Sequence, residues 1–148
     1  MRRLAWILAP ALALAACADD STLSETEPQT ERAALVVGAP AALEPALRMC
    51  APDFAPADVT LRFAGADALA AQVREKAIDV IAVAGRGRLE PLAGALEPAL
   101  AFASDERATY LAAAARASRQ PDAAQALVDD LLAGACHEAL LAEGFGEP

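Results

Sequence analysis

Side chains that could act as a catalytic nucleophile or base are few in this 148-residue chain. His137 is the only histidine, and it lies beside Glu138 on the predicted exposed side of a helix. The serines are Ser21, Ser24, Ser104 and Ser118, and none is near His137 in sequence. No nucleophile and base combination is visible, and no metal-ligand spacing occurs. The sequence therefore predicts no enzyme, no metal site and no cofactor.

Cys17 closes the run Leu14-Ala15-Ala16-Cys17, which resembles the lipobox of bacterial lipoproteins, where the cysteine is diacylated and becomes the new N-terminus. Upstream, Arg2 and Arg3 precede an apolar stretch over 4–14, as in an export signal. An uncleaved membrane helix is the alternative, but the stretch is shorter than the roughly 20 apolar residues that span a bilayer. We expect residues 1–17 to be a lipoprotein signal peptide and Cys17 to anchor the chain at the periplasmic face of a bacterial membrane, inner or outer.

Cys50 and Cys136 then remain as an even pair in an oxidising compartment. Each lies on the apolar face of a predicted helix. Two interpretations stay open at this point. The cysteines form a disulfide, or they are two buried free thiols, which are common in protein cores. Sequence alone does not give the distance between their Cα atoms.

Composition limits both the size of the fold and the kinds of partner. The chain is 56% hydrophobic, largely through alanine, and its length suits one core rather than two full domains. Its formal net charge is −9 and no basic stripe exists, so nucleic acid is not expected as a partner. Residues 18–32 are polar and acidic with no apolar period, which predicts a disordered tether before a single lobe over 33–148.

The elements that position the remaining side chains alternate between strand and helix. Buried strands are predicted at 34–37, 58–63 and 79–84, and helices at 41–50 and 66–76. Pro45 is close enough to the start of its helix to be tolerated, although it can delay that helix by a turn. The resulting βαβαβ unit implies a parallel sheet with right-handed crossovers. No glycine fingerprint follows its first strand, so a nucleotide is not indicated.

The second half of the chain completes the lobe. Residues 85–100 form a weak connection interrupted by two prolines, and extended pieces at 101–104 and 109–116 flank an acidic turn at Asp105-Glu106. Helices are predicted from Pro121 to the break at Gly134, and over 135–143. The predicted fold is α/β: one three-layer lobe with a mostly parallel sheet, a returning antiparallel strand and two C-terminal helices.

The closing segment, from Thr109-Tyr110-Leu111 through Pro121 and its helix to Gly144-Phe145-Gly146, resembles the molybdate-type periplasmic substrate-binding proteins of ABC transporters, in the class II binding-protein fold. Residues 63–73 resemble that family's second strand-to-helix junction, and 78–84 its third strand. The resemblance covers 33–85 and 102–146, one whole lobe. Those proteins clamp an oxyanion between two lobes, whereas here only the short connection at 86–100 stands where the second lobe is inserted.

The resemblance implies where an oxyanion would bind. In the family, serines at the first two junctions hold the anion together with backbone N–H groups, and a tyrosine on the return strand adds its hydroxyl. Tyr110 corresponds to that tyrosine, Ala42 to the first serine, and Gly65-Ala66-Asp67 to the second junction. Ala42 has no hydroxyl, and Asp67 opposes a dianion. Arg86 and Arg88, which follow the third strand on the same edge, could offset Asp67, and helix N-terminal amides can still bind anions.

Each of these residues also has a simpler interpretation: Tyr110 as a partly buried aromatic residue with its hydroxyl toward water, the arginines as solvated loop charges, and Asp67 as a complement to a helix N-terminus. Two functions therefore remain open. One is a lipid-anchored extracytoplasmic solute-binding protein, with an oxyanion such as molybdate and an ABC transporter permease as partners. The other is a ligand-free lipoprotein derived from a binding protein, which acts as an interaction or scaffold module.

Overall fold

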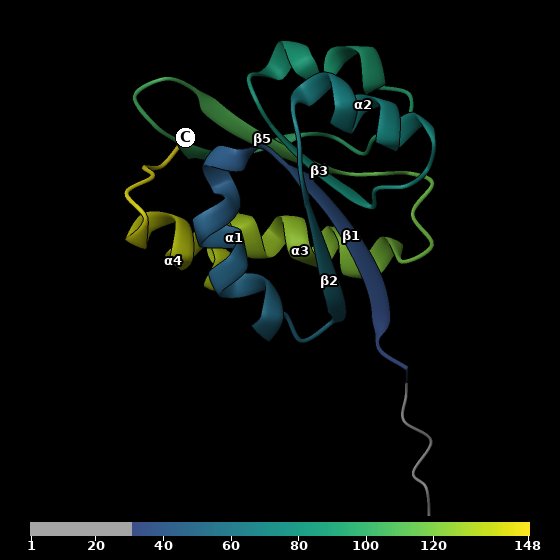
Figure 1. The fold of residues 1–148 in the computed structure, drawn as a ribbon, viewed down its shortest axis with the longest axis horizontal. Helices are drawn as coiled ribbons and strands as arrows, with labels where there is room; N and C mark the ends of the chain where they lie inside the picture. The colour runs from purple at the N-terminus through teal and green to yellow at the C-terminus, as the bar shows by residue number, and fades with distance from the viewer. Residues whose placement is uncertain (1–30) are drawn as a thin grey trace, which may run out of the picture. The chain divides into compact units, whose positions relative to one another are not determined.

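A computed structural model of the chain describes residues 31–148, which hold one five-stranded sheet in the order β2-β1-β3-β5-β4 (Figure 1). The predicted signal peptide and lipidated Cys17, and the tether up to residue 30, lie outside the described residues. The strands are β1 (Ala33–Ala39), β2 (Ala57–Phe63), β3 (Val80–Ala84), β4 (Leu100–Ser104) and β5 (Thr109–Ala114).

Four of the five strands share one direction. β1 pairs in parallel with both β2 and β3, as the predicted βαβαβ unit requires. β5 then returns antiparallel to β3, and β4 is antiparallel to β5, so β4 again runs with β1. The carboxyl ends of β1, β2 and β3 therefore meet at the edge of the sheet where β5 begins.

Helices cover both faces of this sheet (Figure 1). The helices are α1 (Glu44–Cys50), α2 (Ala66–Arg74), α3 (Pro121–Ala133) and α4 (Ala135–Ala142). α2 packs on one face, where Leu69 and Val73 meet Ile81 and Val83 of β3. α1, α3 and α4 pack on the other face, against alternate residues of the same strands. The prediction of a single three-layer α/β lobe, with a returning antiparallel strand and two C-terminal helices, is confirmed.

Close approach between α2 and the sheet depends on Gly38 in β1. A Cβ atom at this position would lie 2.4 Å from Cδ1 of Ile78 and 2.8 Å from Cδ2 of Leu69. Both of those side chains are almost fully buried, so they have little room to move away. The glycine therefore lets the short helix lie directly against the strand.

The first predicted helix, expected over 41–50, begins about one turn later in the structure. A 3-10 turn occupies Ala41–Leu43, and the α-helix begins only at Glu44, with Pro45 in its first turn. Proline fits there because the first N–H groups of a helix have no intrahelical acceptor. The predicted delay of this helix by Pro45 is confirmed.

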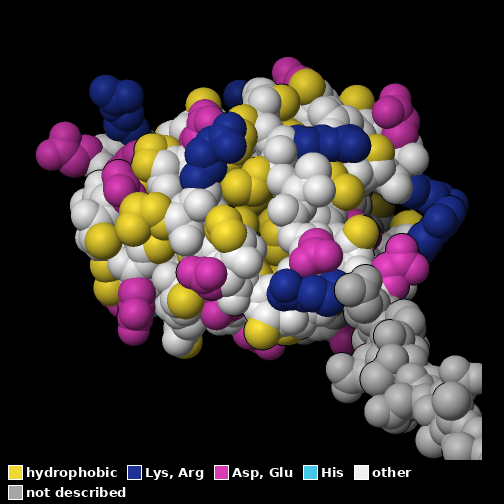
Figure 2. All heavy atoms as spheres, turned by 60° about the horizontal axis from the view of Figure 1, so that its bottom comes forward, with side chains coloured by type: hydrophobic (Ala, Val, Ile, Leu, Met, Phe, Trp, Pro, Cys, Tyr) yellow, Lys and Arg dark blue, Asp and Glu magenta, His cyan; other side chains and the backbone are white. Residues whose placement is uncertain are grey.

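The surface of the described part is polar and mixed in charge. Figure 2 shows acidic and basic side chains scattered among small hydrophobic ones on one face, with no single-sign patch. Within residues 31–148 no charged or polar residue is fully buried. Among the described helices, none has the length and apolar character needed to cross a membrane.

Candidate anion site at the carboxyl edge of the sheet

The structure brings the predicted junctions to one edge of the sheet. β1, β2 and β3 end at Ala39, Phe63 and Ala84, and Tyr110 at the start of β5 pairs with Ala84. Ligands of open α/β sheets bind outside the carboxyl ends of the strands, so this is the expected place for a site.

The second junction presents free backbone donors. Gly65 is the N-cap residue of α2, with φ −68° and ψ 157°, and no side chain caps the helix. Its carbonyl accepts the N–H of Leu69 at 3.0 Å. Within residues 31–148, the N–H groups of Ala66, Asp67 and Ala68 have no acceptor. The positive end of the helix dipole and these N–H groups together favour an anion here.

Arg88 stands beside this helix end. Its Nη1 lies 3.5 Å from Oδ1 of Asp67, whose side chain is 98% exposed. The chain reaches this position by leaving β3 through Gly85, whose φ of +84° a residue with a side chain would rarely adopt. A cavity of about 400 Å³ lies between α2 and the segment that follows β3. It is lined by Ala66, Asp67, Ala70, Arg74, Gly87, Arg88 and Pro91.

The prediction that an arginine offsets Asp67 therefore holds for Arg88. Arg86 instead lines a second cavity of about 330 Å³, on the connection between β3 and β4, together with Arg116 and two glutamates. Arg116 in that cavity is already engaged, since its Nε lies 3.7 Å from Glu97 and donates to the Leu96 carbonyl at 2.8 Å. Arg86 and Arg88, which both follow β3, therefore line different cavities.

Ala42 is exposed and lies in the 3-10 turn that precedes α1. It offers neither a hydroxyl nor a place at the N-terminus of α1, which begins two residues later. The first junction therefore contributes only backbone to this edge, while the second junction and Arg88 carry its polar groups.

Tyr110 lies on the opposite face of the sheet from α2. Its side chain is 4% exposed and its hydroxyl donates a 2.8 Å hydrogen bond to Oδ2 of Asp105. Its ring meets Phe145 edge to face, with centroids 5.5 Å apart. The expectation of a hydroxyl directed toward water was wrong, because the turn between β4 and β5 folds Asp105 over the strand.

Burial and the Asp105 carboxylate together raise the pKa of Tyr110 to about 12. The same hydrogen bond, with two more from the backbone N–H groups of Arg107 and Ala108, holds the pKa of Asp105 below its usual range. Tyr110 is therefore a neutral phenol whose proton is already committed to a carboxylate. It lines neither the cavity beside α2 nor the one that Arg86 lines.

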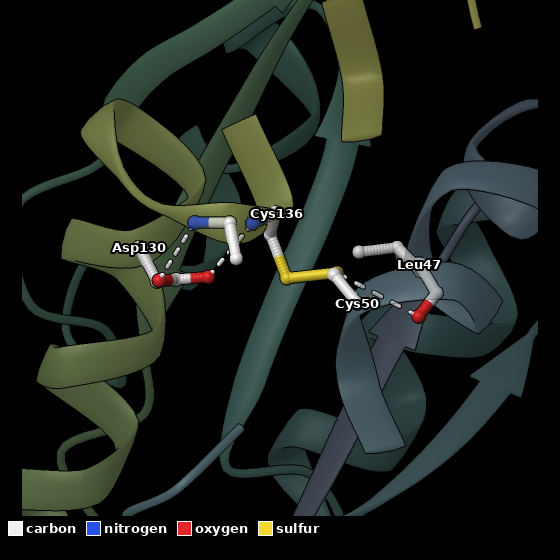
Figure 3. The surroundings of a disulfide bond; sticks show 5 residues. Leu47, Cys50, Asp130 and Cys136 are labelled. Carbon is white, nitrogen blue, oxygen red and sulfur yellow. Dashed lines mark hydrogen bonds between the residues drawn. A yellow bond between two sulfur atoms is a disulfide. The ribbon is translucent and has the colours of Figure 1, made fainter. Parts of the chain in front are cut away.

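Cys50 and Cys136 form a disulfide between α1 and α4 (Figure 3). Their Cα atoms are 5.0 Å apart and both residues are buried. Beside the bridge, Asp130 of α3 accepts the backbone N–H of Cys136 at 2.9 Å and that of Ala135 at 3.2 Å, and so caps the N-terminus of α4 (Figure 3). Of the two interpretations that the sequence left open for these cysteines, the structure has the disulfide, whereas the cap from the preceding helix was not predicted.

His137 also differs from expectation, because it was predicted to be exposed and is mostly buried. Its side chain is only 14% exposed, because the C-terminal residues fold over α4 and Glu147 lies 3.1 Å from Nε2. Nδ1 is buried without a hydrogen-bond partner. No group of three potential metal ligands occurs within residues 31–148.

Comparison with known proteins finds similarity in structure but not in sequence. No family model matches the sequence, and no curated protein matches it. The fold does match a solved structure from Clostridium difficile, assigned as the substrate-binding domain of a molybdenum ABC transporter, with a TM-score of 0.65 over 78% of this chain and 99% of that one. The two sequences are 11% identical, so the match shows a shared fold: that of a binding-protein domain which extends over little more than the single lobe found here.

Proposed function

We propose that this chain is a lipid-anchored extracytoplasmic solute-binding protein that takes a tetrahedral oxyanion such as molybdate at the N-terminus of α2 and presents it to an ABC transporter permease. The observation that carries the proposal is the pairing of uncapped N–H groups on Ala66 and Asp67 with Arg88 across a cavity of about 400 Å³. A fold shared with a substrate-binding domain of a molybdenum transporter supports the same ligand class.

Charge decides how strongly such a site binds. Asp67 places one negative charge at the mouth of the cavity, while Arg88 and Arg74 bring two positive ones. All of these groups are exposed to solvent, so water screens each interaction and single ion pairs contribute little. The backbone donors of α2 do not change with pH or side-chain motion, and they supply the fixed part of the attraction.

Calorimetry with molybdate, tungstate, sulfate and phosphate tests the proposal on a version of the chain that begins at Ala18. All strands, helices and core residues of the structure follow residue 32, so this version retains the whole fold. We expect a larger heat of binding with molybdate or tungstate than with sulfate or phosphate. Asp67→Asn should tighten binding by up to roughly fivefold, because an interaction between solvent-exposed charges contributes about 0.2–1 kcal/mol.

Arg88→Ala should weaken binding by a similar factor, and Arg119→Ala is its matched control. Arg119 is an exposed arginine beside the amino ends of β1 and β3, at the opposite edge of the sheet. Equal affinities in the two arginine variants, or no heat with any oxyanion, would rule out the α2 site. Loss of binding in Tyr110→Phe would mean that the phenol hydroxyl contacts the anion. Unchanged binding would mean that this hydroxyl serves only its hydrogen bond to Asp105 in the β4–β5 turn.

A ligand-free interaction module is the second candidate. The Tyr110 hydroxyl is already donated to Asp105, and Ala42 supplies no hydroxyl. A site on one lobe also leaves its ligand largely exposed, whereas binding pockets commonly bury most of a ligand. A flat calorimetric response across the anion panel would favour this candidate over the first.

The anchor is tested separately from the ligand. Growth with labelled palmitate should label the full chain, and Cys17→Ser should abolish the label while leaving expression intact. A labelled Cys17→Ser variant, or an unlabelled full chain, would contradict lipidation at this residue.

A further inference from the structure

The two outer edges of the sheet differ in how they are protected. Along β4, a bulge between Ala101 and Ala103 interrupts the strand, and Ser104 pairs with Gly146 through two backbone hydrogen bonds of 2.8 and 2.9 Å. β2, at the other edge, is a regular seven-residue strand that pairs only with β1. An open, regular edge of this length is a template for another strand.

The outward-facing backbone groups of β2 can be identified. The N–H of Ala64, directly after the strand, donates to the carbonyl of Ala39 in β1 at 3.1 Å. Because N–H and C=O groups of successive strand residues point to alternate sides, Asp58, Thr60 and Arg62 face β1. Their neighbours Ala57, Val59, Leu61 and Phe63 direct their backbone donors and acceptors outward, where no other described residue pairs with them.

The sequence of β2 is self-complementary about its central residue, Thr60. When a second copy of the strand runs antiparallel with Thr60 opposite Thr60, Asp58 of each copy faces Arg62 of the other. Val59 faces Leu61 in the same register. The outward backbone groups are then used in pairs, so Val59 and Leu61 form hydrogen-bonded pairs. The charged residues fall in the non-hydrogen-bonded pairs, where side chains are closest and opposite charges stabilise.

The face of β2 on the α1 side adds an apolar surface. Val59 and Leu61 are half-buried and form the floor of a cavity of about 560 Å³. Its other lining residues are Arg48, Ala51, Pro52 and Asp58. In the antiparallel arrangement, a twofold axis perpendicular to the sheet places Val59 and Leu61 of both copies side by side on the same face of the joined sheet. Pairing of the two β2 strands therefore buries apolar side chains as well as backbone groups.

From these features we infer that β2 is a homodimer interface: two copies of this chain join antiparallel through β2 about Thr60, forming one continuous sheet. A second copy of this chain is the partner that fits, because the charge pattern of β2 is complementary to itself. Asp58 is negative and 66% exposed, Arg62 is positive and exposed, and each has its opposite at the symmetric position. Arg32 of the same chain lies 3.3 Å from Asp58 and adds a further positive charge beside it, so charges of opposite sign alternate across the interface.

Sedimentation equilibrium of the version beginning at Ala18 tests the dimer across micromolar to millimolar concentrations. We expect a reversible dimer. Asp58→Arg places arginine opposite arginine twice and should yield a monomer. Adding Arg62→Asp to that variant restores both pairs with their signs exchanged and should restore the dimer. Glu106→Arg, the same charge change in the exposed β4–β5 turn, is the matched control and should leave the dimer intact.

A cross-link tests the register. Thr60→Cys puts two thiols in a non-hydrogen-bonded pair, where Cα atoms lie roughly 4.5 Å apart and a disulfide can close. Mild oxidation should convert this variant to a covalent dimer, whereas Thr109→Cys, at an exposed position on β5, should stay uncross-linked. Circular dichroism confirms that each variant is folded. A chain that stays monomeric at all concentrations overturns the inference, as does a dimer that survives Asp58→Arg and does not cross-link through Thr60.

Discussion

At the scale of single residues, the hydrogen bond between Tyr110 and Asp105 has a direct spectroscopic consequence. Tyr110 is the only tyrosine, and a version beginning at Ala18 lacks the single tryptophan. Alkaline titration of its phenolate absorbance should therefore give one midpoint, near 12. Because the folded pKa lies above the ordinary value of 10, the contribution to stability is complete below pH 10 and is lost as pH rises through 12.

Asp105→Ala tests the cause of that shift. Burial is the largest contribution and remains in the variant, so the midpoint should fall but stay above 10. Glu106→Ala, a neighbouring carboxylate that accepts no bond from Tyr110, should leave it unchanged. A wild-type midpoint at 10 would mean that Tyr110 is neither buried nor hydrogen-bonded to Asp105 in solution, and equal midpoints in Asp105→Ala and wild type would mean that the bond is not maintained.

The sequence placed Tyr110 at the start of its strand but did not predict its acceptor. Asp105 reaches the hydroxyl only because its other carboxylate oxygen accepts the N–H groups of Arg107 and Ala108, which shapes the turn. His137 was misjudged for a related reason, since its partner, Glu147, comes from a segment that folds back over α4. Contacts of this kind depend on turns and chain ends, where hydrophobic periodicity carries no information.

At the scale of elements, the end of α2 contains the one non-glycine residue with a positive φ in residues 31–148. Lys76 has φ 59°, and the N–H of Ala77 reaches back to the carbonyl of Gln72 at 2.8 Å. This is a Schellman motif, in which glycine is the preferred residue. Lys76→Gly should raise the free energy of unfolding by roughly 0.5–1 kcal/mol, because the left-handed conformation costs a side chain about 1–2 kcal/mol. Urea unfolding measures the change.

Glu75→Gly is the matched control for that variant. Glu75 precedes Lys76 but has a helical φ of −78°, so glycine there relieves no strain and increases the entropy of the unfolded chain. It should lower the free energy of unfolding. A destabilised Lys76→Gly variant would show that the lysine stem contributes more than the backbone strain costs.

The elements themselves could largely be predicted. Continuous apolar runs gave β1 and β3, and the apolar stripe after Pro121 gave α3, because both patterns follow from burial alone. The carboxyl-edge position of Ala66 and Asp67 followed from the parallel order of strands. What remained open was which arginine meets Asp67: Gly85 and the short turn after it turn Arg88 toward α2 and Arg86 toward another cavity.

At the scale of the whole molecule, a small core of mainly aliphatic side chains has to stabilise a sheet with a solvent-exposed edge. Many buried positions are alanines, which remove little apolar surface from water. The outer edge of β2 also leaves backbone donors and acceptors without a partner among the described residues. The disulfide between α1 and α4 offsets this small hydrophobic contribution to stability. Both helices cover the same face of the sheet, and the bridge joins residues that are 86 positions apart in sequence.

The disulfide should therefore account for a large part of the total stability. In the chain-entropy model, closing a loop of this length contributes about 4.6 kcal/mol, against roughly 5–15 kcal/mol for a whole domain. The Cys50→Ala, Cys136→Ala double variant should lose about that amount in urea unfolding, and reduced wild-type protein should behave alike. Met49→Ala, an exposed change in the same helix as Cys50, is the control and should leave stability nearly unchanged. If oxidised and reduced protein unfold at the same urea concentration, the alanine-rich core is stable without the bridge.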